Sequence, residues 1–220
     1  MDIHKPKPWR GVREFLKEYL ITFIGVLTAL GFEEGVQWLH WRSAVGEARA
    51  ALRQEVAANA TLALVDRQQS ACILAKLGDY KAWAQGGPRP NITARLLAPT
   101  STVWDITKAG QMASHMPVKE QLAYAGFYAN VANLQNVIQS QRAATARLVG
   151  YAQKTSFTPD EAARFSQDRS ETGAWYRAVL NNDEYLLAAA KALGVTPNAP
   201  PAQTRQRLAN LCAPTPAQAR

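Results

Sequence analysis

The two cysteines and three histidines are the residues whose chemistry is easiest to recognise. Two cysteines in an exported domain usually form a disulfide, whereas cytosolic cysteines stay reduced. If the chain is exported, we expect Cys72 to pair with Cys212; the alternative is one buried thiol and one exposed thiol in the tail. His4, His40 and His115 stand in separate segments, outside any Cys/His array with metal-ligand spacing, so no metal site is predicted.

Other catalytic patterns are missing from the sequence as well. It has no GxSxG, no phosphate-binding GxxxxGK[ST] and no dinucleotide fingerprint after a strand. Asp160-Glu161 and Asp183-Glu184 are adjacent pairs, and sequence neighbours project about 100° apart on a helix, so neither predicts a carboxylate dyad. We therefore expect no catalytic residue and no cofactor. The remaining alternative is an enzyme with an unfamiliar active site built on helices.

An apolar segment near the N-terminus indicates where the chain resides. Residues 19–32 contain no charge, but a span needs about 20 residues to cross about 30 Å of hydrocarbon. The flanks extend the segment to residues 19–41, with Tyr19 on one side and Trp38 and Trp41 on the other as an aromatic belt at the membrane interface. A transmembrane helix is therefore expected over residues 19–41.

Three interpretations of this segment compete. It is a signal anchor with a cytoplasmic basic N-terminus (residues 1–18), a cleaved signal peptide, or a core helix of a soluble protein. The signal anchor is favoured because helix-forming sequence continues without a break through Arg42. The predicted location is the bacterial inner membrane, single-pass, with the C-terminal domain in the periplasm.

Small residues in the span could let another helix approach closely. Gly25 and Ala29, then Gly31 and Gly35, repeat at four-residue spacing, and Glu33 lies among them near the outer boundary. A homo-oligomer or a partner helix is the sharper interpretation of this pattern. Frequent small residues and a solvated carboxylate at the membrane edge are the simpler one.

The remaining sequence predicts an all-α fold. Apolar residues recur at helical spacing up to Trp83, and further helices are expected at 101–115, 117–153, 158–194 and 204–212. The predicted N-terminal signals are Ser101 or Thr102 for the second helix and a capping box at Thr158 and Glu161 for the fourth. We expect the single transmembrane helix to continue into an antiparallel bundle of three to five long helices over residues 42–194. Residues 195–220 would form a proline-rich linker, a short helix and a tail.

Charge narrows the class of partner. Residues 42–220 carry 20 basic and 12 acidic side chains, which favours anionic partners such as lipid headgroups or an acidic protein face. The basic residues form no cluster with interleaved aromatics, so nucleic acid is not expected. The predicted partners are the lipid bilayer and an envelope protein or anionic envelope component.

Several segments resemble a group of uncharacterised bacterial single-pass envelope proteins with an N-terminal membrane helix and a helical exported domain. The matching residues are IGVLTAL at 24–30, Trp38 or Trp41, LRQEV at 52–56 with Asn59, and the stretch from Trp104 to Gly110. Glu33-Glu34 departs from the amide residues of that pattern. The resemblance implies a membrane-anchored helical protein and transfers no active site. The expected function is a non-enzymatic interaction or scaffold protein, with an accessory subunit or assembly factor acting through its membrane helix as the alternative.

Overall fold

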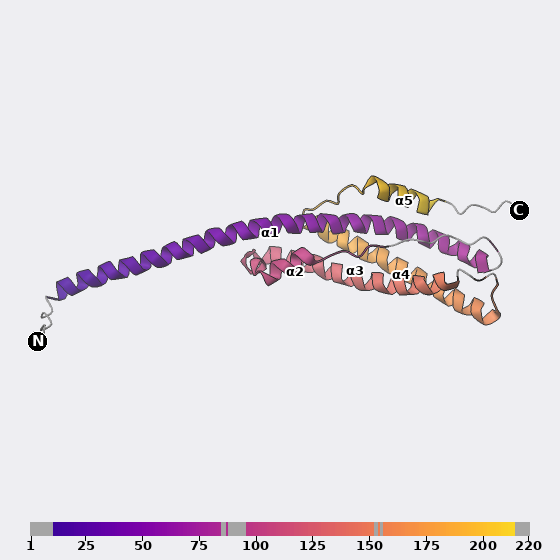
Figure 1. Cartoon of the computed structure of the whole chain (residues 1–220), viewed down its shortest axis with the longest axis horizontal. Helices are drawn as coiled ribbons and strands as arrows, with labels where there is room; N and C mark the ends of the chain where they lie inside the picture. Colours follow the sequence, from indigo (N-terminus) through magenta and orange to yellow (C-terminus); the bar gives the residue numbers. More distant parts are fainter. Residues whose placement is uncertain (1–10, 85–86, 88–95, 152–153, 155, 214–220) are drawn as a thin grey trace, which may run out of the picture. The chain divides into compact units, whose positions relative to one another are not determined.

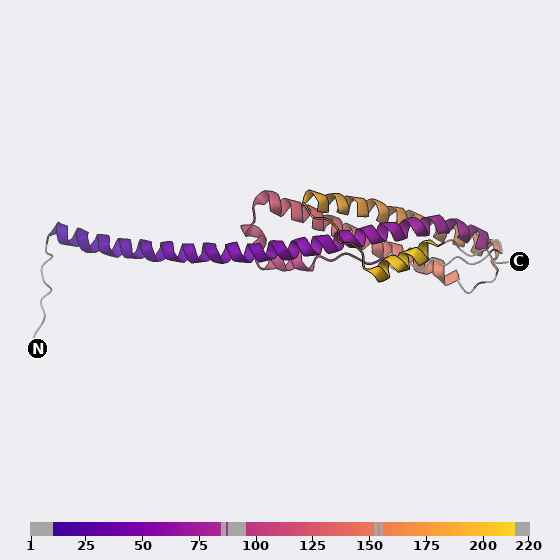
Figure 2. The same ribbon diagram turned by 90° about the horizontal axis from the view of Figure 1, so that it is seen from above.

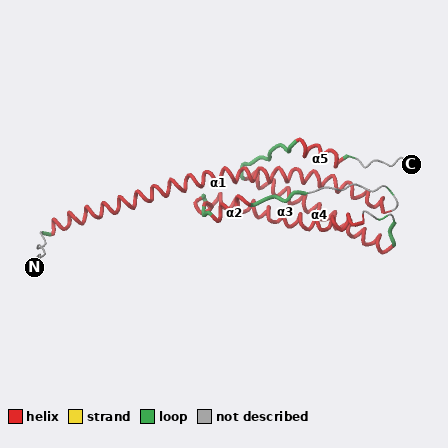
Figure 3. Tube along the Cα trace, viewed as in Figure 1, coloured by secondary structure: helices red, strands yellow, loops and turns green. Residues whose placement is uncertain are grey.

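The computed structural model describes residues 11–84, 87, 96–151, 154 and 156–213. Within them the fold is all-helical, as predicted, with five α-helices, one 3-10 helix and no strand (Figure 3). The chain divides into two compact units, residues 1–47 and 48–220, and helix α1 passes through both. Most of the predicted N-terminal segment (residues 1–18) and the last seven residues of the predicted tail lie outside the described residues.

Helix α1 runs from Val12 to Ala84, which confirms the long helix expected from the sequence. No proline occurs between residues 9 and 87, so nothing interrupts the backbone hydrogen-bond ladder. The second half of α1 carries an apolar stripe that the bundle buries completely, at Leu52, Val56, Ala60 and Ile73. This stripe is the α1 contribution to the core of residues 48–220.

After α1 the chain returns along the same helix before the next long helix begins. Asn59 binds the backbone N–H and C=O of Thr100 at 3.0 and 2.7 Å, and Glu55 accepts from the Val103 N–H at 3.1 Å. Helix α2 (Thr102–Ala109) and 3-10 helix η1 (Met112–His115) follow. Thr100 thus contacts Asn59, and Val103 contacts the earlier residue Glu55. This return segment (Leu96 to Val103) therefore runs back toward the start of α1.

Helix α3 (Val118–Gly150) consequently runs parallel to the second half of α1, and the antiparallel pairing expected for these two helices is wrong. Glu120 at the start of α3 binds Arg49 at 2.7 Å, and Tyr128 binds Glu55 at 2.6 Å, so both helices advance together. The physical reason is the return segment, which brings the chain back to the level of Arg49 before α3 starts.

Helix α4 (Pro159–Ala192) runs antiparallel to α3 and to α1. Asn133 of α3 binds Asn182 at 2.5 Å, and Arg147, farther along α3, binds the earlier residue Asp168 at 3.2 Å. The predicted capping box is confirmed: Thr158 accepts from the Glu161 N–H while the Glu161 side chain accepts from the Thr158 N–H. Figures 1 and 2 show α3 and α4 alongside the second half of α1.

The segment predicted as a proline-rich linker is held on α1. Thr61 accepts a hydrogen bond from the Asn198 N–H at 2.8 Å, and Arg53 donates to the Gly194 carbonyl at 3.3 Å. Gly194 has a φ of +67°, a left-handed conformation that glycine adopts readily at a helix end. Helix α5 (Ala202–Cys212) follows and buries only Leu208 among its residues. Few side-chain contacts of its own therefore fix α5.

Candidate functional site

The N-terminal half of α1 carries most of the large apolar side chains that are exposed among the described residues. One helix of the described chain is long and apolar enough to cross a membrane, and its apolar window has no buried residue. The large exposed side chains there are Val12, Phe15, Leu16, Tyr19, Leu20, Ile21, Phe23, Ile24, Val26, Leu27, Leu30, Phe32, Val36, Trp38 and Leu39. Contiguous apolar surface of this extent marks a site of membrane or protein contact.

Polar side chains within this segment find partners on the helix itself. The hydroxyls of Thr22 and Thr28 donate to the carbonyls of Glu18 and Ile24, at 3.0 and 2.7 Å. Glu33 accepts from Gln37 at 3.5 Å. A helix that satisfies its backbone and hydroxyl groups internally is compatible with hydrocarbon, where no water replaces a missing bond.

The predicted interface residues Tyr19, Trp38 and Trp41 lie on this exposed helix. At 1.5 Å per residue, Tyr19 and Trp38 stand about 30 Å apart along the axis, which equals the usual hydrocarbon thickness. The Tyr19 ring stacks between Phe15 and Phe23, at centroid distances of 6.3 and 6.0 Å. The Arg42 guanidinium lies 5.1 Å from the Trp38 ring centroid, so a cation marks the same end as the tryptophans.

The predicted packing residues leave room for another helix. A Cβ atom built on Gly25, Gly31 or Gly35 meets nothing within 4 Å. On a helical wheel Gly25 and Ala29 share one face, and Gly31 and Gly35 share a second face about 120° away. The residues predicted as one contact surface are thus two narrow surfaces, with Glu33 nearer to the first.

A second polar arrangement surrounds Glu55 inside the bundle. Its carboxylate accepts hydrogen bonds from the hydroxyls of Tyr128 and Thr100, at 2.6 and 3.2 Å, and from the Val103 N–H. The predicted N-cap residue Ser101 makes no side-chain cap bond and donates to Asp105 instead, so Glu55 caps α2 from another helix. Burial and the bond to Glu55 raise the pKa of Tyr128, which keeps its phenol protonated as a donor. This network is structural, since every oxygen of Glu55 is used.

A third arrangement has unused oxygens. Asp66 and Asp183 are buried with exposed fractions of 1% and 0%, and their four carboxyl oxygens have no hydrogen-bond partner. The hydroxyls of Ser70 and Thr172 are likewise buried without a partner, whereas Thr145 and Gln141 lie close enough to the buried Tyr176 hydroxyl to act on its pKa. Buried polar groups are normally hydrogen-bonded, so an unpartnered set of this size is unusual for a helical core.

Burial determines the ionisation of these groups. Loss of solvation raises the pKa of Asp66 to about 7, while the Leu97 backbone amide and Arg142 act in the opposite direction. Burial, followed by the charge of Asp66, raises the pKa of Asp183 to about 8, against the effect of Arg67. Burial also raises the pKa of Tyr176 to about 12. Both carboxyls are therefore neutral in mildly acidic solution.

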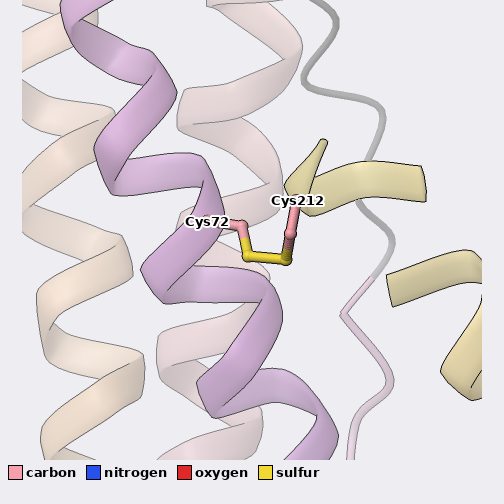
Figure 4. Close-up of a disulfide and its surroundings, with 2 residues drawn as sticks. All are labelled: Cys72 and Cys212. Atoms are coloured by element: carbon pink, nitrogen blue, oxygen red, sulfur yellow. A yellow bond between two sulfur atoms is a disulfide. The ribbon is translucent and has the colours of Figure 1, made fainter. Parts of the chain in front are cut away.

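The predicted sulfur pair is brought together by the fold. Cys72 on α1 and Cys212 at the end of α5 form a disulfide with a Cα–Cα distance of 5.1 Å and a sequence separation of 140 residues (Figure 4). That Cα–Cα distance lies within the usual range for disulfides. The bridge attaches the weakly buried helix α5 to the bundle.

Known proteins give no independent guide to the site. Comparison with protein-family models, curated proteins and solved structures finds no match to this chain. Within the described part of the chain, no group of three or more His, Cys, Asp or Glu side chains is placed to hold a metal ion.

Sequence reasoning missed the pairing of Asp66 with Asp183. The acidic pairs visible in the sequence are adjacent residues, whereas Asp66 and Asp183 come from α1 and α4, which are distant in sequence. One signal was available: Asp66 and Ser70 interrupt the apolar stripe of α1 at positions where its periodicity calls for apolar residues. Asp183 likewise occupies the apolar face of α4, between the buried residues Val179 and Leu186.

Proposed function

We propose that this chain is a membrane-anchored, non-enzymatic interaction or scaffold protein of the bacterial envelope. One observation carries the proposal: the first part of α1 exposes a continuous apolar surface about as long as a bilayer is thick, while the same helix continues into a closed bundle. By the positive-inside rule the basic N-terminus faces the cytoplasm and the bundle faces the periplasm of an inner membrane. The lipid bilayer is then the first partner.

The bundle is the part that meets a further partner in this proposal. Its residues from 42 onward carry an excess of basic side chains, which favours an acidic protein face or an anionic envelope component. Large apolar side chains also stay exposed on the bundle helices, among them Leu122 on α3 at 68% and Tyr185 on α4 at 64%. Aromatic and apolar side chains of this kind often anchor protein interfaces.

The alternative function places the contact in the span. Gly25, Gly31 and Gly35 have open space around their Cβ positions, which favours an accessory subunit or assembly factor that binds a partner helix, or a homo-oligomer. The Glu33 carboxylate would then pair with a cation of the neighbouring helix near the membrane edge.

Exchange of the span separates the two functions. Residues 19–41 are replaced by an unrelated glycine-free span of equal length, and a photo-crosslinking amino acid is placed at Leu122 or Tyr185 in cells, or at Gly31 of the native span. We expect a defined protein adduct from a bundle position that persists after the exchange. Adducts from Gly31 alone, lost with the native span, would favour the accessory-subunit function. No adduct from any bundle position would contradict the scaffold proposal.

A further inference from the structure

The two carboxyls in the centre of the bundle lie at one level of the fold. A Cβ on Gly173 of α4 would lie 3.3 Å from Leu77 Cδ1 of α1, which sets the register of these antiparallel helices. Asp66 lies eleven residues before Leu77, and Asp183 ten residues after Gly173. Each separation is about three helical turns, so both side chains lie in one layer of the bundle. The charge of Asp66 accordingly raises the pKa of Asp183.

Few charges are available to offset this pair. Arg142 of α3 acts on Asp66, but its guanidinium donates to the Leu96 carbonyl at 2.8 Å. Arg67 of α1 acts on Asp183, and the side chain of Arg67 is exposed. Tyr176 of α4 is a further titratable group nearby, and the charge of Asp66 raises its pKa. No hydrogen bond from a described residue reaches either carboxyl, and the nearby Leu97 backbone N–H lowers the pKa of Asp66 only in part. Ionisation would therefore leave two buried negative charges in one layer of the bundle.

We propose that Asp66 and Asp183 form a buried proton-binding pair, and that the bundle loosens when they ionise and release their protons to solvent. A proton neutralises each carboxyl without a further ligand. A metal ion would need several further ligands. The described residues include no third acidic, histidine or cysteine side chain grouped with the pair. The pair lies within the bundle, so its titration does not depend on the membrane anchor.

The direction of the pH effect follows from proton linkage. Both folded-state pKa values, about 7 and about 8, lie above the value near 4 of an unfolded aspartate. Between about pH 4 and pH 8 the folded chain thus binds more protons than the unfolded chain, and stability falls as pH rises. This trend is opposite to that of a protein stabilised by ionised, paired carboxylates.

Thermal unfolding of the full chain in detergent micelles tests the pair. Between pH 5 and pH 8 we expect the wild-type Tm to fall by at least about 5 °C. Asp66→Asn and Asp183→Asn should each reduce this fall, and the double variant should remove most of it. Glu184→Gln is the matched control, because Glu184 is the exposed neighbour of Asp183 on the same helix; it should retain the wild-type pH dependence.

Carbon-13 NMR of aspartate-labelled wild-type protein gives a readout that needs no folded variant. Two carboxyl resonances should titrate near neutral pH, and sequential assignment should identify them as those of Asp66 and Asp183. Titration of all aspartates near pH 4, or a Tm unchanged between pH 5 and pH 8, would overturn the proposal. Stabilisation of the wild type, but not of the double variant, by millimolar Ca²⁺ or Mg²⁺ at pH 8 would overturn it in favour of a cation site.

Discussion

Arginine at both Ile24 and Leu27 is expected to release the chain from the membrane into the soluble fraction. These two positions lie near the middle of the apolar segment, and each is about half exposed. An arginine at the centre of a span costs about 2.5–3.5 kcal/mol on insertion scales, so two cost about 5–7 kcal/mol. The segment is barely long enough to insert, and this cost exceeds what its remaining apolar residues supply. Membrane flotation followed by an alkaline wash measures the loss.

The double substitution of Val118 and Leu122 by arginine is the control for this prediction. Both residues are large, apolar and 68% exposed, but they lie on α3 of the bundle. If the exposure of α1 reflects lipid contact, only the Ile24/Leu27 pair changes the fractionation. Equal behaviour of the two double variants in the membrane fraction would show that the apolar segment does not anchor the chain.

Loss of the Cys72–Cys212 disulfide is expected to destabilise the bundle by up to about 4–5 kcal/mol. The bridge closes a loop of 140 residues, and the chain-entropy model gives a value of that size as an upper figure for such loops. For a chain of this length the corresponding fall in Tm is on the order of 10 °C. Urea unfolding of the full chain in micelles, with and without reductant, measures the change.

A local consequence accompanies the global one. Helix α5 buries only Leu208, and the side chains of Arg205 and Arg207 are exposed already. Without the bridge α5 should detach and lose its helical backbone, so trypsin should cleave after Arg205 and Arg207 faster than in the oxidised chain. A Cys72→Ser/Cys212→Ser double variant provides the control, because reductant should leave its stability unchanged. Identical urea midpoints for oxidised and reduced wild type, or two free thiols on exported protein, would contradict the prediction.

Helices were predictable where local chemistry determines them. The unbroken run of α1 follows from the absence of proline, and the start of α4 follows from Thr158, Pro159 and Glu161, whose capping geometry the structure confirms. The disulfide was predictable only as a pairing, since two cysteines allow one bridge. The helix signals lie in residues that are close in sequence, and the disulfide signal lies in the number of cysteines, which allows one pairing.

Helix direction and the buried carboxyls were not predictable in the same way. Periodicity shows which face of α3 is buried but not whether α3 runs with or against α1. The return segment from Leu96 to Val103, held by Asn59 and Glu55, decides that direction. The pairing of Asp66 with Asp183 depends in turn on the register of α1 and α4, which only the assembled bundle provides.

Protease accessibility of the full-length chain in spheroplasts tests the anchoring of α1 most directly. Protease added outside intact spheroplasts should digest the bundle. A fragment containing the N-terminal half of α1 should remain in the membrane pellet after an alkaline wash. Recovery of the undigested chain in the cytosolic soluble fraction would contradict the membrane anchor, the periplasmic bundle and the scaffold function built on them.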